Sequence, residues 1–279
     1  MRLQSISEIT DGLQQLNVDK TEKTEKTDKT DKTEKNTVEE ISDSVEEKPK
    51  KIKVVLAVPG NDFSSKAFVS WINTLNVLWN QGKYDIVVSP GISSYVTFAR
   101  IQTFGASVLR GIEQKPFNGL EFDILLSIDT DIIFSAEQVM DIIDGALKKK
   151  VVAGMYRMSD LKNYAFVKDW DVEYFLENGT FEFSTPESIE EWKKTHPNER
   201  YMDVAYSGMG FFAIHSSVLN NLTYPYFAGE IFEIKDKNGK LIREMFSEDV
   251  CLCKNIQKLG YKVWVDTNIR VGHLKEMVI

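Results

Sequence analysis

An apolar run that stops on two carboxylates constrains this chain more than any other feature. Residues 124–128 read Ile-Leu-Leu-Ser-Ile, and Asp129 and Asp131 follow directly. A short run of this kind is typical of a strand that is covered on both faces in a parallel α/β sheet. Ligands of such sheets bind at the carboxyl ends of the strands. The sequence therefore places both carboxylates where a ligand would bind, and residues one apart can converge on a single cation.

The Asp-x-Asp motif alone leaves a simpler interpretation open. A second copy, Asp169–Asp171, has no apolar strand before it. Residues 135–138 read Ser-Ala-Glu-Gln, which is a capping box, and acids just before a helix are ordinary because they complement the helix dipole. The surrounding segments must decide between a metal site and a helix start.

Strand-like and helix-like segments alternate from residue 52 onward, which predicts a doubly wound α/β sheet with right-handed crossovers. The expected strands are 52–58, 84–88, 122–128 and 151–155, and the expected helices are 68–79, 93–109 and 136–148. The alternation of strands and helices stops after residue 157. The aromatic and charged residues 158–203 are expected to form an insertion over the sheet edge, where loops commonly determine specificity.

The last third of the chain carries clear turn and helix signals. A strand is expected at 208–214, and Lys237-Asn-Gly-Lys240 predicts a hairpin between 231–234 and 241–245. Ser247 opens a helix that Gly260 ends. Cys251 and Cys253 lie two apart in that helix, so we expect reduced, half-buried thiols rather than a disulfide or a zinc site.

Composition divides the chain in two. Residues 1–50 include five Thr-acid-Lys triplets in succession, which predicts a disordered low-complexity tail, and residues 51–279 are expected to form one domain. The formal charge is −8 and the basic clusters are short, so no nucleic-acid surface is expected. Without an apolar run of about 18 residues or a signal-peptide pattern, the chain is expected to be soluble and cytoplasmic, with no transmembrane segment.

Further acidic and imidazole positions stand out downstream: Glu248 and Asp249 open a helix, and His273 follows Gly272. Mg²⁺ and Mn²⁺ take oxygen ligands, Mn²⁺ tolerates an imidazole, and substrate phosphates commonly complete the site. The pattern suits an enzyme whose substrate carries a diphosphate, because a cation neutralises the charge of that leaving group.

The order of these motifs resembles the family 2-like glycosyltransferases of the GT-A fold, in the nucleotide-diphospho-sugar transferase superfamily. The shared order is a strand with Asp-x-Asp, a Gly-rich strand, Glu-Asp at a helix start, Gly-Tyr-Lys-Val-Trp-Val-Asp, and Gly-His. The resemblance covers about residues 52–275. It implies a GT-A (Rossmann-like) α/β fold, with a mixed, mostly parallel sheet and helices on both faces. It also implies transfer of a sugar from a UDP- or GDP-sugar to a hydroxyl of a glycan, protein or lipid-linked acceptor.

The resemblance also implies roles for single residues. Asp131 and His273 would hold Mn²⁺ or Mg²⁺. Asp129 would contact the ribose or a metal-bound water and is a further candidate ligand of the metal. Asp249, beside Glu248, would be the general base, kept ionised by the helix N-terminus. The alternatives are a plain loop histidine at 273 and two acids that only compensate a helix dipole.

Donor contacts are expected from a second group of residues. Arg100 stands where relatives carry Ala-Arg-Asn, but Ile101 follows it here, so its role is open between a uracil or phosphate contact and a surface ion pair. Pro59 and Asp62 in the first loop are expected to contact the donor, while Arg157 and Gly208 would border the sugar or acceptor pocket.

Three other functions are alternatives to glycosyl transfer. In a haloacid-dehalogenase-like phosphatase Asp129 would be the nucleophile and Asp131 the acid, but that motif usually ends the first strand. A sugar nucleotidyltransferase should carry a Gly-rich, basic loop after the first strand, and residues 59–62, Pro-Gly-Asn-Asp, are not one. A non-catalytic nucleotide-sugar or carbohydrate-binding module would not need the base and the metal residues. Inverting and retaining outcomes both stay open.

Overall fold

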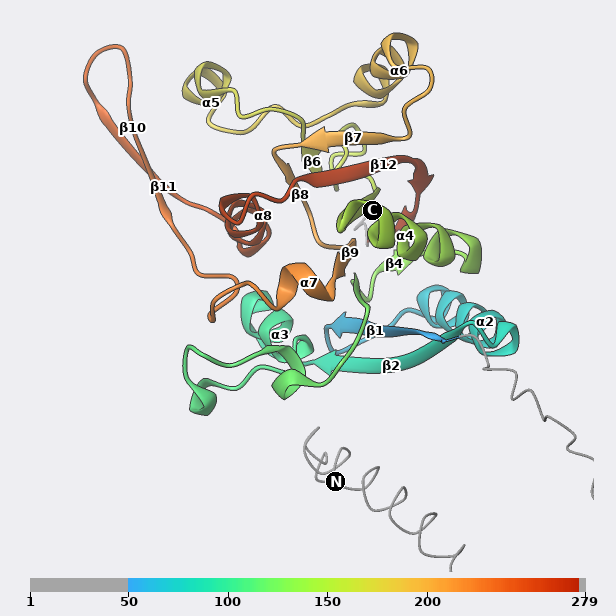
Figure 1. Cartoon of the computed structure of the whole chain (residues 1–279). Helices are drawn as coiled ribbons and strands as arrows, with labels where there is room; N and C mark the ends of the chain where they lie inside the picture. Colours follow the sequence, from blue (N-terminus) through green and yellow to red (C-terminus); the bar gives the residue numbers. More distant parts are fainter. Residues whose placement is uncertain (1–49, 276–279) are drawn as a thin grey trace, which may run out of the picture. The chain divides into compact units, whose positions relative to one another are not determined.

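The computed structural model describes residues 50–275, which belong to one compact unit beginning at Lys50 (Figure 1). The tail expected at residues 1–50 lies outside the described residues, apart from Lys50 itself. No helix in the described part of the chain is long and apolar enough to cross a membrane.

The unit is built on a seven-stranded sheet in the order β2-β1-β3-β9-β5-β12-β7. Its strands are β1 (Ile52–Pro59), β2 (Tyr84–Gly91), β3 (Ile124–Ile128), β5 (Val151–Met155), β7 (Tyr201–Val204), β9 (Phe211–His215) and β12 (Val263–Arg270). β9 and β7 run against the direction of the other strands. The expected mixed, mostly parallel α/β sheet is therefore confirmed, with β9 inserted antiparallel between β3 and β5.

Helices cover both faces of this sheet. Alternate side chains of β1 enter different cores: Leu56 belongs to the cluster that holds Leu78 and Ile142, whereas Ala57 belongs to the one that holds Leu219 and Leu252. The helices of the first face are α2 (Ser65–Gln81) and α4 (Ala136–Lys149), and those of the second are α3 (Val96–Thr103), α7 (Ser216–Leu219) and α8 (Glu248–Lys258). This burial on both faces explains why β3 is continuously apolar.

The helix expected at 93–109 is shorter than predicted. It ends at Thr103, and Gly105 follows with a φ of +61°, in the left-handed region that favours glycine. A short 3₁₀ turn occupies Val108–Arg110 instead. Gly260, with a φ of +84°, follows the end of α8 as expected.

The segment expected as an insertion contributes to the sheet itself. Its last strand, β7, pairs with β12 and forms the sheet's edge. The rest contains β6 (Phe166–Val167), α5 (Val172–Asn178) and α6 (Pro186–Thr195). Helix α5 is not expected from the sequence, because seven residues are too few for a helical period to show.

The remaining strands form three small two-stranded ladders. They are β4 (Ile132–Ile133) with β13 (Gly272–His273), β6 with β8 (Tyr206–Ser207), and β10 (Ile231–Lys235) with β11 (Leu241–Met245). The last pair is the predicted hairpin. Its turn residue Gly239 has a φ of +80°.

Gly91→Ala is expected to destabilise the fold by about 3 kcal/mol, as overpacking does. A Cβ at Gly91 would lie 2.0 Å from the carbonyl oxygen of Ala99, a backbone atom that cannot move without displacing α3. Urea unfolding measures the change. Gly229→Ala is the control, because a Cβ there meets nothing within 4 Å. Equal midpoints for the two variants would contradict the close approach of β2 and α3.

Candidate functional site

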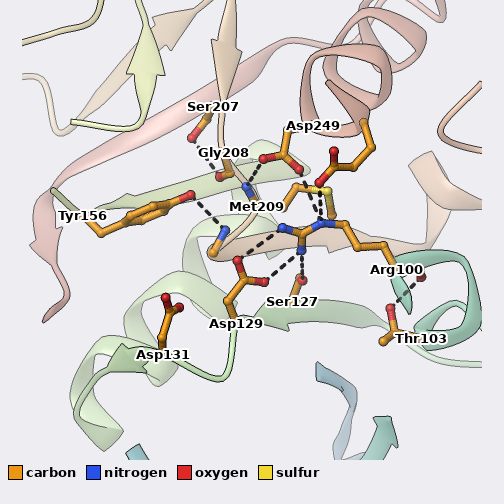
Figure 2. A network of polar contacts seen from close by, with 12 residues as sticks. Arg100, Thr103, Ser127, Asp129, Asp131, Tyr156, Ser207, Gly208, Met209 and Asp249 are labelled. Carbon is orange, nitrogen blue, oxygen red and sulfur yellow. Dashed lines mark hydrogen bonds and ion pairs between the residues drawn. The ribbon is translucent and has the colours of Figure 1, made fainter. Parts of the chain in front are cut away.

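Charged side chains from three distant parts of the chain meet at the carboxyl end of β3 (Figure 2). Asp129 follows β3 directly, Arg100 comes from α3, and Glu248 and Asp249 form the first turn of α8. The structure thus brings together the acidic strand end and the Glu-Asp helix start, which are separated by more than a hundred residues in the sequence.

Arg100 lies at the centre of this cluster and is only 3% exposed. Its two terminal nitrogens donate to the two carboxylate oxygens of Asp129, at 2.9 and 3.2 Å. Its Nε lies 3.3 Å from Glu248 Oε1 and 3.4 Å from Asp249 Oδ1. The ion pair is therefore buried, and the surface ion pair considered from the sequence is wrong. A fork of this kind fixes both position and orientation.

The cluster carries an excess of negative charge. Burial opposes the charge of Arg100, but Asp129, Asp249 and Glu248 outweigh it and raise the pKa of the guanidinium. One cation facing three carboxylates leaves a formal charge of 1 − 3 = −2 when all are ionised. Such a site favours either a proton or a further cation.

Asp249 holds one oxygen in place and leaves the other without a hydrogen bond. Its Oδ2 accepts from the Met209 amide at 3.3 Å (Figure 2). Its Oδ1 is buried and has no hydrogen-bond partner among the described residues, because the Arg100 Nε bonds to Glu248 instead. An acceptor oxygen left open in a buried cluster is costly, so it points to a missing donor.

The protonation of Asp249 departs from the expectation that the helix N-terminus keeps it ionised. Burial is the largest influence and raises the pKa of this carboxyl, with help from Glu248 and Asp129 and against the lowering effect of Arg100. Desolvation therefore outweighs the helix end in setting the pKa of this carboxyl. A raised pKa brings a carboxylate closer to the range in which a general base works best near neutral pH.

Asp131 and His273 form a second polar pair beside this cluster. β13 pairs with β4, which sets His273 opposite Ile132. The ring nitrogen Nε2 lies 3.1 Å from Asp131 Oδ2, and Nδ1 lies 2.6 Å from the Arg157 carbonyl. Lys275 Nζ contacts the same Asp131 oxygen at 2.8 Å.

This pair fits a divalent cation. The 3.1 Å between Asp131 Oδ2 and His273 Nε2 is close to the separation of about 3 Å between neighbouring ligands in an octahedron with bonds of about 2.1 Å. A metal-bound histidine commonly donates its other N–H to a backbone carbonyl, the position that Arg157 supplies here.

Asp129 does not turn toward this pair. Both its oxygens accept from Arg100, and Figure 2 shows the Asp131 carboxylate standing apart from that network. No group of three or more His, Cys, Asp or Glu side chains surrounds a possible cation in residues 50–275. Any ion here would thus take two ligands from the chain and the rest from substrate and water.

Asp131 and His273 shift each other's pKa. Burial opposes ionisation of Asp131, but hydrogen bonds with His273 and Lys275 lower the pKa of this carboxyl to about 2. Burial also opposes the charge of His273, but Asp131 and the Arg157 carbonyl raise the pKa of the imidazole. The pair is charged on both sides at mildly acidic pH.

Asp131→Asn is expected to lower the pKa of His273, because the carboxylate that favours the imidazolium is lost. An NMR titration of the imidazole protons measures it. His215, whose own pKa burial lowers, serves as the internal control. A His273 titration that does not move in the variant would show that Asp131 does not hold the ring.

The same shifts set a pH window for the contribution of this pair to stability. The Asp131 part is present above its unfolded pKa of about 3.9 and is lost as the pH falls toward the folded value. The His273 part is present below its unfolded pKa of about 6.5 and is lost as the pH rises through the raised value.

Arg157 and Gly208 lie at the site in ways that the sequence does not reveal. Arg157 contributes its carbonyl to His273, while its guanidinium lies over the Tyr164 ring, 4.7 Å from the centroid. Gly208 packs so closely on the Tyr156 hydroxyl that a Cβ would lie 2.2 Å from it. Glycine at 208 is therefore a packing requirement.

The first loop reaches the acidic strand end through Gly60. Pro59 is buried at the end of β1, and a Cβ at Gly60 would lie 2.9 Å from Thr130, the residue between the two acids. Asp62 is exposed. The loop therefore borders the site with its backbone.

Tyr156 is the site residue that sequence reasoning missed. Its buried hydroxyl accepts from the Gly210 amide at 3.1 Å, and its ring meets the His273 ring edge-on at 5.1 Å. Burial and the nearby Asp249 raise the pKa of this phenol, so it stays neutral. The sequence contained a signal for this residue, because Tyr156 directly follows the strand at 151–155, just as Asp129 directly follows β3. Side chains at such strand ends lie where a ligand would bind.

The two cysteines are free, and both are fully buried rather than half-buried. Cys251 and Cys253 direct their sulfurs at the carbonyls of Phe246 and Ser207. Burial raises the pKa of Cys253 to about 12, so this thiol is a packing residue rather than a nucleophile.

Comparison with known proteins gives weak structural likenesses only. No protein-family model matches the sequence, and no curated protein matches it. A197 from STIV matches with a TM-score of 0.43 and 15% identity over 81% of this chain and 86% of its own. GalNAc-T7, solved with UDP, GalNAc and Mn²⁺, matches with 0.42 and 13% over 81% of this chain but only 43% of its own.

A further likeness is to glucosyl-3-phosphoglycerate synthase from Mycobacterium tuberculosis, solved with Mn²⁺, UDP-glucose and phosphoglyceric acid. Its TM-score is 0.40 at 15% identity, over 82% of this chain and 74% of the other. Likenesses at this level carry no conclusion about what this chain binds or does. The fold and the site stand on their own geometry.

Proposed function

We propose that this chain is a metal-dependent glycosyltransferase of the GT-A type. It would transfer a sugar from a UDP- or GDP-sugar to a hydroxyl of a glycan, protein or lipid-linked acceptor. The observation that carries the proposal is the buried Oδ1 of Asp249, which has no hydrogen-bond partner among the described residues. It lies at the same end of the sheet as Asp129 and Asp131.

Asp249 is suited to be the general base. The Met209 amide fixes one oxygen, and the other, the buried Oδ1, lies 3.4 Å from Arg100 Nε without a hydrogen bond. An acceptor hydroxyl that donates to Oδ1 would satisfy it and would be oriented for attack on the anomeric carbon. As the new C–O bond forms and the bond to the diphosphate breaks, the hydroxyl proton passes to Asp249. If the outcome is retaining, the same contact positions the acceptor only.

Asp131 and His273 would hold Mn²⁺ or Mg²⁺ on the donor side. When bound, the cation neutralises the charge that develops on the departing diphosphate. Asp131 keeps its charge over the physiological range because its pKa is low. Asp129, fixed by Arg100, would present its remaining lone pairs to the donor ribose or to a metal-bound water.

Arg100 links the two halves of the site. It forks onto Asp129 and extends Nε toward Glu248 and Asp249. Its charge opposes the desolvation of Asp249 and so limits how far the pKa of the base rises. The residue therefore positions the donor-side carboxylate and tunes the base.

Donor hydrolysis tests the proposal. The protein is incubated with UDP- and GDP-sugars plus Mn²⁺, and release of the nucleotide is compared with that of Asp131→Ala and of the control Asp85→Ala, which changes an exposed acid on β2. We expect release from one donor, lost on chelation and in Asp131→Ala but kept in Asp85→Ala. Silence with every donor, together with no metal-dependent binding of UDP or GDP, would leave a non-catalytic binding module.

A further inference from the structure

A pocket of about 580 Å³ lies in the segment 168–202, apart from the residues of the candidate site. Its walls come from the stretch before α5, the stretch 182–185, helix α6 and Met202 of β7. None of the acids at positions 129, 131, 248 and 249 lines it. The pocket is therefore separate from the candidate site, and none of the proposed catalytic or metal-binding residues belongs to its wall.

Aromatic rings form one part of the wall. Trp192 and His196 stack with their centroids 4.8 Å apart and their planes 10° from parallel. Phe183 also lines the pocket. Flat apolar ring surface next to polar groups is the combination by which proteins hold small polar ligands in a fixed orientation.

Hydrogen-bonding groups form the other part. Ser184 is only 8% exposed, and its hydroxyl takes no part in the side-chain hydrogen bonds of residues 50–275. Glu182 and Glu191 add carboxylates, whereas Asp171 caps α5 with its side chain. A hydroxyl that lines a pocket and makes no side-chain hydrogen bond of its own can bind a polar ligand there.

The wall of the pocket is acidic, which favours a neutral ligand over an anionic one. The only lysine in the wall, Lys168, is paired with Asp169 at 3.2 Å, and Glu191 pairs with Lys194 of its own helix at 3.4 Å. Glu182 therefore has no ion pair among the described residues, and the wall keeps more acids than bases. Phosphates and acidic sugars would be repelled. A neutral sugar offers hydroxyl donors to the carboxylates and a C–H face to the rings, so it matches both halves of the wall.

The pocket is built onto the strand that positions the base. Phe183 meets the buried Tyr206 ring edge-on at 6.4 Å. Tyr206 belongs to β8, which leads directly to Met209, and the amide of Met209 holds Asp249. One wall of the pocket and the proposed base therefore share a packed aromatic support.

We propose that this pocket binds a neutral sugar unit of a glycan, as a second carbohydrate site apart from the donor site. Its role as an acceptor subsite rests on the proposed transferase activity, whereas the binding itself does not. Glu182, Glu191 and Ser184 accept hydrogen bonds from the sugar hydroxyls. The ring of His196, backed by Trp192, packs against the C–H face.

Glycan binding is measured on the full chain without donor or metal, by calorimetry and saturation-transfer NMR with maltotriose, mannotriose and N-acetyllactosamine. We expect at least one of them to bind, and at least tenfold weaker binding in both Glu182→Gln and His196→Ala. Glu173→Gln is the matched control, since it changes an acid of α5 outside the pocket wall. Melting temperatures verify that each variant folds.

The outcomes separate this proposal from the proposed function. Binding that the pocket variants weaken, while nucleotide release from the donor is unchanged, supports the second site. The same binding in a protein that hydrolyses no donor keeps the site and removes the transferase. Absence of binding by all three glycans, binding equal in all variants, or capture of an oligolysine peptide in place of the sugars would overturn the proposal.

Discussion

Asp249→Asn is expected to lower the rate of sugar transfer by about 10³-fold, within the range that general-base catalysis contributes. The amide keeps the size of the carboxylate and an oxygen that accepts from Met209, but it cannot take the acceptor proton. Oδ1 of Asp249 has no hydrogen-bond partner among the described residues, and Oδ2 accepts from a backbone amide. No neighbouring side chain is therefore in place to accept the proton instead.

The measurement is kcat with a donor that the hydrolysis assay has identified and with an acceptor glycan. Glu248→Gln is the matched control, because Glu248 belongs to the same helix turn and the same ion cluster, but its Oε1 already accepts a hydrogen bond from Arg100. We expect a much smaller loss there and unchanged donor affinity in both variants. A rate for Asp249→Asn within tenfold of the native rate would remove Asp249 as the base.

The pH profile adds an independent check on the same residue. Burial raises the pKa of Asp249, so the ionised base is lost at a higher pH than for an exposed aspartate. The acidic limb of kcat/KM should therefore lie above the usual aspartate range and should vanish in Asp249→Asn. A native profile that stays flat down to about pH 4 would mean that Asp249 is ionised throughout.

Local sequence pattern was enough to predict the elements that place the site. β3 is an apolar run buried on both faces, and the acids that follow it leave the sheet at its carboxyl end. The start of α8 and the turn of the hairpin were also predicted, because Ser247 precedes the helix directly and Gly239 lies in the turn itself. These features depend on neighbours within a few residues, which a single sequence contains.

Long-range burial explains what the sequence did not predict. Arg100 looks like a surface residue in its own stretch, and only the packing of α3 against β1 and β2 encloses it among three acids. The pKa of Asp249 follows from the same enclosure, which outweighs the local helix end. The role of Tyr156 depends on its contact with the Gly210 amide, which spans 54 residues.

Arg100→Met is expected to reduce the free energy of unfolding by about 3–5 kcal/mol at neutral pH, the usual cost of leaving buried charges without their partner. Methionine fills a similar volume, so the loss reports charge rather than a cavity. Asp129, Glu248 and Asp249 would face one another without a counterion. Arg100→Lys keeps the charge but cannot fork onto Asp129, so we expect an intermediate loss.

Urea unfolding between pH 5 and 8 measures the effect and identifies its cause. Carboxyls without Arg100 have raised folded pKa values, so the folded state takes up protons as the pH falls and the variant regains stability. The gap to the native protein should therefore narrow toward pH 5. Arg243→Met is the control, because its pair with Glu233 on the hairpin is exposed and is worth less than about 1 kcal/mol. A stability gap that is constant with pH would mean that Arg100 acts through packing rather than charge. The histidines titrate in both proteins, so a change of the gap with pH reports the carboxylates that Arg100 contacts.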